Sequence, residues 1–197
     1  MRKLILVTGP MRAGKTSLCK ALFSILEQKC TRPFAIIEEN QRDGQGIPHT
    51  IVLRDLGGDE SMPLASRKPL PSAGYPPFDF CPEAFAWAMD RLKTAIEQGC
   101  GPVILDEIGA LETRQGGGFL MAAAWAMDHG KEPLVMTIRP ERVDSLLERL
   151  SSMTEIGFKQ CYQLGDIDPE KLASVIADYV FSIARAANEL YIQSRHS

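Results

Sequence analysis

The sequence predicts an α/β fold with a mostly parallel β-sheet flanked by helices. Three observations lead to this class: short continuous apolar runs, amphipathic segments with helical spacing, and repeated alternation between the two. Strands of a parallel sheet are covered on both faces, so they read as unbroken apolar runs. Their alternation with helical patterns is typical of helices that connect parallel strands of one sheet.

The individual elements follow from the same two patterns, taken in chain order. Apolar runs predict strands over 4–7, 34–37, 102–105 and 134–137, an alternating pattern predicts one over 49–53, and residues 159–164 are expected to form the last strand. Apolar residues three and four positions apart predict helices over 14–29, 83–98, 117–129 and 140–150. Asp168 and Pro169 suit the N-cap and first turn of a closing helix. Its predicted buried face holds Leu172, Val175, Ile176, Tyr179, Val180 and Ile183.

One stretch, residues 66–82, interrupts the alternation. It contains five prolines and is too long for an ordinary connection. It is either a lid or binding loop, or an excursion without function. Its aromatic residues Tyr75, Phe78 and Phe80 either stack on a base or, as the simpler interpretation, pack within the protein.

Length and composition fit a single domain over residues 1–197. Of these residues, 45% are hydrophobic and 24% are charged, with a net charge of −3. This slightly acidic balance argues against a protein that coats nucleic acid or an anionic membrane. No obligate protein partner is evident from the sequence.

The cysteines and the N-terminus favour a soluble cytoplasmic protein. The five cysteines are scattered, and with three histidines they form no zinc-binding pattern, so we expect mostly packed, free thiols. The first apolar run is shorter than the 7–15 residues or so of a signal-peptide core. No run approaches the roughly 20 residues of a membrane span.

The strongest functional signal is a phosphate-binding loop. The pattern G-x-x-x-x-G-K-[ST] matches residues 9–16, between a predicted strand and a predicted helix. Its glycines let backbone N–H groups surround phosphate oxygens, and the helix N-terminus adds positive charge. Lys15 is expected to reach the β- and γ-phosphates, and the Thr16 hydroxyl to bind Mg²⁺. The predicted nucleotide-binding residues are Gly9, Pro10, Met11, Arg12, Ala13, Gly14, Lys15, Thr16 and Ser17.

A second signal is the pair Asp106-Glu107 at the end of the predicted strand 102–105. Acidic residues there should lie at the carboxyl edge of the sheet, where open α/β proteins bind ligands. Asp106 is expected to bind Mg²⁺ with Thr16, directly or through water. Glu107 is expected to orient or deprotonate an attacking water, a contribution of roughly 10²–10⁴-fold to the rate.

The segment Asp106-Glu107-Ile108-Gly109, with Glu112 after it, resembles the Asp-Glu-Ile-Gly-x-Met-Glu signature of the small P-loop nucleoside triphosphatases. That family includes thermophile enzymes and the cancer-related nucleoside triphosphatase. The likeness runs from about residue 4 to 140 and includes a hairpin ahead of Leu64-Ala65. It implies a RecA-like P-loop fold and Mg²⁺-dependent hydrolysis of nucleoside 5′-triphosphates to diphosphate and phosphate, with loose base preference.

The chain departs from that family in the phosphate loop, where Met11-Arg12 replaces the usual Pro-Gly. The Arg12 guanidinium either turns into solvent, the simpler interpretation, or lies beside the γ-phosphate as an arginine finger in cis. Such fingers contribute 10³–10⁵-fold in other phosphoryl-transfer enzymes. Arg12 therefore joins Lys15 and Glu107 as a catalytic candidate. Arg42, Arg114 and Arg139 stay open between phosphate ligands and solvated loop charges.

Two other functions stay open at this point. The loop also resembles that of thymidine kinases, without their clustered zinc cysteines, so the protein could be an ATP-dependent kinase acting on a nucleoside, a nucleotide or another small molecule. It could also be a nucleotide-gated binding module with incidental turnover.

Overall fold

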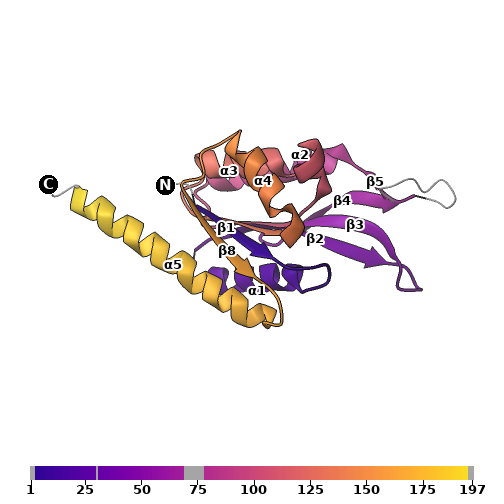
Figure 1. The fold of residues 1–197 in the computed structure, drawn as a ribbon, viewed down its shortest axis with the longest axis horizontal. Helices are drawn as coiled ribbons and strands as arrows, with labels where there is room; N and C mark the ends of the chain where they lie inside the picture. The colour runs from indigo at the N-terminus through magenta and orange to yellow at the C-terminus, as the bar shows by residue number, and fades with distance from the viewer. Residues whose placement is uncertain (1–2, 30, 69–77, 195–197) are drawn as a thin grey trace.

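An eight-stranded sheet runs through the centre of the protein, with helices on both faces (Figure 1). The computed structural model describes residues 3–29, 31–68 and 78–194. The strands are β1 (Lys3–Thr8), β2 (Phe34–Arg42), β3 (Pro48–Asp55), β4 (Glu60–Arg67), β5 (Phe78–Phe80), β6 (Val103–Ile108), β7 (Leu134–Ile138) and β8 (Phe158–Gln163). The helices are α1 (Lys15–Gln28), α2 (Pro82–Glu97), α3 (Leu120–His129), α4 (Val143–Ser151) and α5 (Pro169–Ser194).

The sheet has the order β5-β4-β3-β2-β6-β7-β1-β8. Strands β2, β6, β7, β1 and β8 pair in parallel, and β2 to β5 pair as antiparallel neighbours. The predicted class is therefore confirmed, with a mostly parallel sheet extended at one side by antiparallel hairpins. Strand β7 lies between β1 and β6, so it separates the two strands that carry the predicted phosphate loop and carboxylates.

The core has two layers, one on each face of the sheet. Helices α1 and α5 cover one face, and α2, α3 and α4 cover the other (Figure 1). On β1, Leu4 and Leu6 pack in the second layer, whereas Ile5 and Val7 pack in the first. Burial on both faces explains why this strand reads as a continuous apolar run.

Several predicted elements need correction. Strand β4 went unrecognised from periodicity because Ser61, Pro63 and Ser66 break its apolar pattern, although the hairpin implied by the family resemblance is present. Residues 78–80 form β5, within the stretch expected to be irregular, and residues 69–77, including Tyr75, lie outside the described part. Before α3, a short π-helix η1 (Leu111–Gln115) intervenes, and a 3-10 turn η2 (Pro140–Arg142) precedes α4.

The start of α5 agrees with the sequence, but one position on its buried face does not. Asp168 Oδ1 accepts hydrogen bonds from the backbone N–H groups of Glu170 and Lys171, as expected of an N-cap. Val175 was expected to be buried but is 53% exposed, because α5 packs mainly on α1 through Leu172, Ile176 and Val180. Val175 points away from that contact.

The described cysteines are all free thiols, and their packing varies from buried (Cys19) to exposed (Cys161). Within the described ranges, no helix is both long enough and apolar enough to cross a membrane.

Candidate active site

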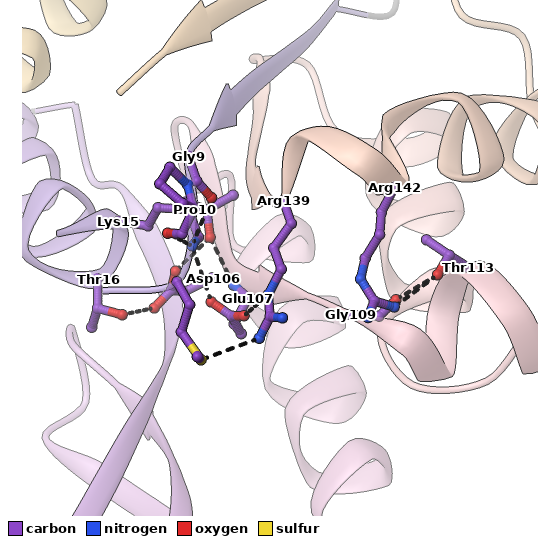
Figure 2. Close-up of polar contacts among 12 residues, drawn as sticks. Gly9, Pro10, Lys15, Thr16, Asp106, Glu107, Gly109, Thr113, Arg139 and Arg142 are labelled. Carbon is purple, nitrogen blue, oxygen red and sulfur yellow. Dashed lines mark hydrogen bonds and ion pairs between the residues drawn. The ribbon is translucent and has the colours of Figure 1, made fainter. Parts of the chain in front are cut away.

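The predicted functional residues converge on one cleft of about 580 Å³ at the carboxyl edge of the sheet. The loop after β1, the end of β6 and the residue after β7 meet there (Figure 2). The backbone N–H of Gly9 donates to the carbonyl of Ile138, which ties the loop to β7. The lining residues are Met11, Arg12, Gly14, Lys15, Thr16, Ser17, Glu38, Asn40, Arg42, Ile51, Phe78, Glu107 and Arg139.

Two positions of the phosphate loop have positive φ angles: Arg12 at 65° and Gly14 at 93°. Gly14 directly precedes α1, and two features require glycine there. Its φ angle is positive, and an added Cβ would lie only 2.8 Å from Pro169 Cγ. Arg12 is an exposed L-residue in a conformation that favours glycine. Its side chain lines the cleft, so the solvent-facing interpretation and the phosphate-binding one both stay compatible with its position.

Lys15 lies under this loop and is 4% exposed. Its Nζ donates to the carbonyl oxygens of Gly9 (3.2 Å) and Pro10 (3.1 Å), and it lies 3.7 Å from Glu107 Oε2. Gly9 and Pro10 therefore hold the ammonium through their carbonyls rather than by lining the cleft. Ala13 packs against the core layer of α1 and α5.

Asp106 is fully buried, and both of its carboxylate oxygens accept hydrogen bonds. Thr16 Oγ1 donates to Oδ2 at 2.6 Å, and Thr137 Oγ1 donates to Oδ1 at 2.5 Å. Burial raises the pKa of Asp106, while the hydrogen bonds from Thr137 and Thr16 lower it. The hydroxyl of Thr16 and the carboxylate of Asp106 thus lie side by side beneath the loop.

This pair of oxygen ligands fits a magnesium ion that is shared with a nucleotide. Mg²⁺ prefers hard oxygen ligands and usually takes one or two carboxylates from the protein, with phosphates and water completing the site. In the part of the chain that the structure describes, no cluster of three or more His, Cys, Asp or Glu residues could hold a metal ion. Thr16 and Asp106 supply two oxygen ligands, which is the number expected for a metal ion whose remaining ligands come from phosphate and water.

Glu107 departs from regular strand geometry, with a φ of 58°. The pairing of β6 with β7 shifts between Leu105 and Ile108, and the backbone N–H of Glu107 donates to Thr137 Oγ1 (2.8 Å). The side chain therefore leaves the strand ladder and enters the cleft, where it is 30% exposed. Non-glycine residues with positive φ gather at functional sites, since the surrounding structure must hold them there.

Thr137 is the functional residue that sequence reasoning missed. Its single hydroxyl accepts the backbone N–H of Glu107 and donates to Asp106 (2.5 Å), so it fixes both predicted carboxylate residues. One signal in the sequence could have identified it: Thr137 is a hydroxyl residue at the end of the apolar run 134–137. This run is the strand that follows the Asp106-Glu107 strand in the sequence. Such a residue is fully buried here and needs a polar partner.

The wall of the cleft opposite the loop includes two candidates from the sequence, Arg42 and Phe78, and three residues that were not predicted to line it, Glu38, Asn40 and Ile51. Glu38, Asn40 and Arg42 alternate along β2, which places them on one face of the strand. Ile51 and Phe78 continue this wall from β3 and β5. Burial raises the pKa of Glu38 well above its usual range, and the nearby carboxylates of Glu107, Asp106 and Glu112 raise it further.

Two residues singled out from the sequence, Glu112 and Arg114, do not line the cleft. Glu112, the last residue of the family signature, is buried and accepts the backbone N–H groups of Gly109 and Phe119, both at 2.8 Å. These hydrogen bonds stabilise the conformation of the segment that follows β6, from Gly109 to Phe119. Arg114 is exposed, and the cleft lining does not include it.

Comparison with known proteins identifies a family for most of the chain. A family model described as NTPase matches residues 4–170, from β1 to the first turn of α5. A search of curated proteins finds no match. The matched region contains the phosphate loop, both carboxylates and Thr137. The chain therefore belongs to the NTPase family, the small P-loop enzymes that hydrolyse nucleoside triphosphates.

Proposed function

We propose that the protein hydrolyses nucleoside 5′-triphosphates to diphosphate and phosphate with Mg²⁺ and with little preference for the base. The observation that carries this proposal is the convergence of Lys15, Thr16 and Glu107 in one cleft, with the buried carboxylate of Asp106 hydrogen-bonded to Thr16. Cation, metal-binding oxygens and a partly exposed carboxylate are the groups that phosphoryl transfer to water requires.

Thr16 and Asp106 would hold the metal ion. A Mg²⁺ ion held there would supply positive charge that offsets the negative charge of the nucleotide's phosphates. The short Thr16–Asp106 contact orients the hydroxyl, and Thr137 fixes the other oxygen of the carboxylate. These two hydrogen bonds keep Asp106 in one orientation, so its carboxylate needs little further ordering when a metal ion binds.

Lys15 and Glu107 would act on the γ-phosphate and the attacking water. The carbonyls of Gly9 and Pro10 hold the Lys15 ammonium at the loop, where it can exchange them for phosphate oxygens. Glu107 lies in the cleft next to that ammonium, so its carboxylate can accept the proton of a water aligned with the γ-phosphate. Loose base preference is supported by a loop that reads phosphate through backbone N–H groups and Lys15, which every triphosphate engages alike.

The first test is phosphate release from ATP, GTP, CTP and UTP, with and without Mg²⁺. We expect turnover of several triphosphates, loss of turnover when the ion is chelated, and loss of binding in Lys15→Ala. Glu107→Gln should keep nucleotide binding and lower turnover by about 10²–10⁴-fold.

Glu141→Gln serves as the matched control, since Glu141 is exposed and outside the cleft lining. It should turn over at the wild-type rate. A wild-type rate in Glu107→Gln would overturn the assignment of the base, and Mg²⁺-independent release would overturn the metal site.

Membership of the NTPase family sets aside the non-catalytic binding module, but one observation favours testing phosphoryl transfer to an acceptor. The cleft continues past Glu107 onto Glu38, Asn40 and Phe78, which leaves room beside the γ-phosphate end for more than a water molecule. In the same assay, diphosphate formed in excess of free phosphate when candidate acceptors are added would identify a kinase. Equal amounts would support hydrolysis.

A further inference from the structure

Arg139 is the second cation that approaches Glu107. It directly follows β7, and its side chain crosses the cleft between the phosphate loop and the end of β6 (Figure 2). Its Nε lies 3.8 Å from Glu107 Oε1, and its Nη2 lies 3.7 Å from Met11 Sδ. The guanidinium is 33% exposed, so it is open to a ligand that enters the cleft.

Both of these contacts are weak for an arginine. A thioether sulfur is a poor acceptor, and an N···O distance of 3.8 Å is outside hydrogen-bond range. A guanidinium has five N–H donors in a planar fork that matches the oxygens of a phosphate group. Arg139 therefore loses little by giving up its present contacts to bind a phosphate inside the cleft.

Glu107 is held between two cations, with Lys15 on one carboxylate oxygen and Arg139 on the other. Both cations border the same part of the cleft, and a terminal phosphate bound there would compete with this single carboxylate for them.

We propose that Arg139 is a catalytic residue that leaves Glu107 and binds the γ-phosphate when a nucleoside triphosphate enters the cleft. This inference rests on the proposed hydrolysis at the same cleft. The water oxygen bonds to the γ-phosphorus, the bond to the bridging oxygen breaks, and its electron pair leaves with the diphosphate. The water proton passes to Glu107, while Lys15 and Arg139 balance the negative charge on the phosphoryl oxygens.

The neighbouring arginines do not share this position. Arg142, three residues further along, points toward Thr113 and donates to its Oγ1 (3.4 Å), away from Glu107 (Figure 2). Arg42 lines the cleft, but its Nη1 donates to the carbonyl of Gly46 at 2.7 Å. Among these three, Arg139 is the one that is both in contact with Glu107 and held by weak partners.

The test compares the binding of a non-hydrolysable triphosphate analogue and of a diphosphate, each with Mg²⁺, to wild type and to Arg139→Ala. Because the diphosphate has no γ-phosphate, its affinity should be unchanged. The affinity for the triphosphate analogue should fall about ten- to a hundredfold, the loss expected for a charge-assisted contact. Arg139→Lys should recover part of this affinity, since it keeps the charge without the fork.

Arg114→Ala is the matched control, because it removes the same charge from an exposed side chain outside the cleft lining. It should bind both ligands as wild type does. An equal loss for both ligands in Arg139→Ala would show a general structural or electrostatic effect and overturn the proposal. No loss for either ligand would overturn it too. Because these affinities are measured without turnover, the effect of Arg139→Ala on binding can be interpreted even if the protein does not hydrolyse triphosphates.

Discussion

Two cleft residues, Arg12 and Glu107, have backbone conformations that their side chains disfavour. Their φ angles are 65° and 58°, in the left-handed region. For an L-residue this conformation costs roughly 1–2 kcal/mol relative to the right-handed one. Glu107 is held there by Thr137, whereas Arg12 is exposed at the tip of the phosphate loop. A strained arginine at a position that glycine would fill without strain is an argument for a role of its side chain.

Substitution of Arg12 separates that role from the strain. Arg12→Gly relieves the strain but adds conformational entropy to the unfolded chain, so the free energy of unfolding should change by less than about 1 kcal/mol. Arg12→Ala keeps the strain. If the guanidinium acts on the phosphates, both variants should release phosphate at least tenfold more slowly than wild type. Urea unfolding and a phosphate assay measure the two effects, and full activity in Arg12→Gly would place the arginine in solvent.

Residues with a fixed spacing could be predicted from the sequence, and residues that support them could not. The loop pattern and the Asp-Glu strand end led directly to Lys15, Thr16, Asp106 and Glu107, which the structure brings together. The sequence makes Arg139 a candidate because it follows an apolar run, but its contact with Glu107, like that of Thr137 with Asp106, depends on the strand order that places β7 beside β6. That order is a property of the folded sheet and leaves no local pattern in the chain.

At the scale of elements, an ion-pair network joins α2 to the hairpin of β3 and β4. Arg91 Nε donates to Asp55 Oδ2 (2.6 Å), and its Nη1 lies 2.9 Å from Glu60 Oε1. The guanidinium also lies over the Trp87 ring. Asp55 is 4% exposed, and its other oxygen accepts the backbone N–H groups at the β3–β4 turn. The antiparallel wall of the cleft is thereby fixed to the helical layer.

Removing Arg91 should therefore destabilise the protein far more than removing a surface arginine. Arg91→Ala leaves the buried Asp55 without its cation, and such a loss typically costs about 3–5 kcal/mol. Arg54→Ala is the control on β3, next to Asp55, because the Arg54 side chain is 41% exposed and pairs with Glu39 and Asp59, so its loss should lower the free energy of unfolding much less. Urea unfolding compares the two variants. Equal losses would contradict the assigned role of the network.

Strands buried on both faces could be predicted, because burial itself produces the apolar run. Strand β4 exposes most of its residues, and β5 has three residues, so neither carries a distinct pattern. Both exist because an antiparallel neighbour completes their hydrogen bonds. Their formation is decided by the sheet and not by their own sequence.

For the whole molecule, a net charge of −3 conceals a concentration of carboxylates at the cleft. Glu38 on β2 is near Glu107, Asp106 and Glu112, and its pKa is raised well above its usual range, chiefly by burial. The adjacent Glu39 shows the opposite shift, since its hydrogen bond from Lys20 lowers its pKa. Two consecutive residues of one strand thus make opposite contributions to the pH dependence of stability.

The direction in which each residue changes the free energy of unfolding with pH depends on whether the folded or the unfolded chain binds its proton more tightly. The folded protein holds the Glu38 proton more tightly than the unfolded chain does, so this residue lowers stability as pH rises above about 4.3. Glu38→Gln should therefore raise the free energy of unfolding at pH 7 to 8 and weaken its decline with pH. Glu39 contributes stability above its unfolded pKa, which is lost as pH falls, so Glu39→Gln should lower stability at pH 7. Thermal unfolding across pH measures both, and the same sign for the two variants would contradict the assignment.

Strand β1 precedes all the other strands of the sheet in sequence, yet its two partners, β7 and β8, are the last two strands to be synthesised. Leu4 pairs with Leu134 on one side and with Lys159 on the other. A ribosome adds about 5–20 residues per second, so on the order of 10 s separate the synthesis of this strand from that of its neighbours. A nascent chain can therefore carry the whole Gly9–Thr16 motif with no sheet to support it. Nucleotide can help to hold this part of the sheet together only after β7 and β8 have been synthesised.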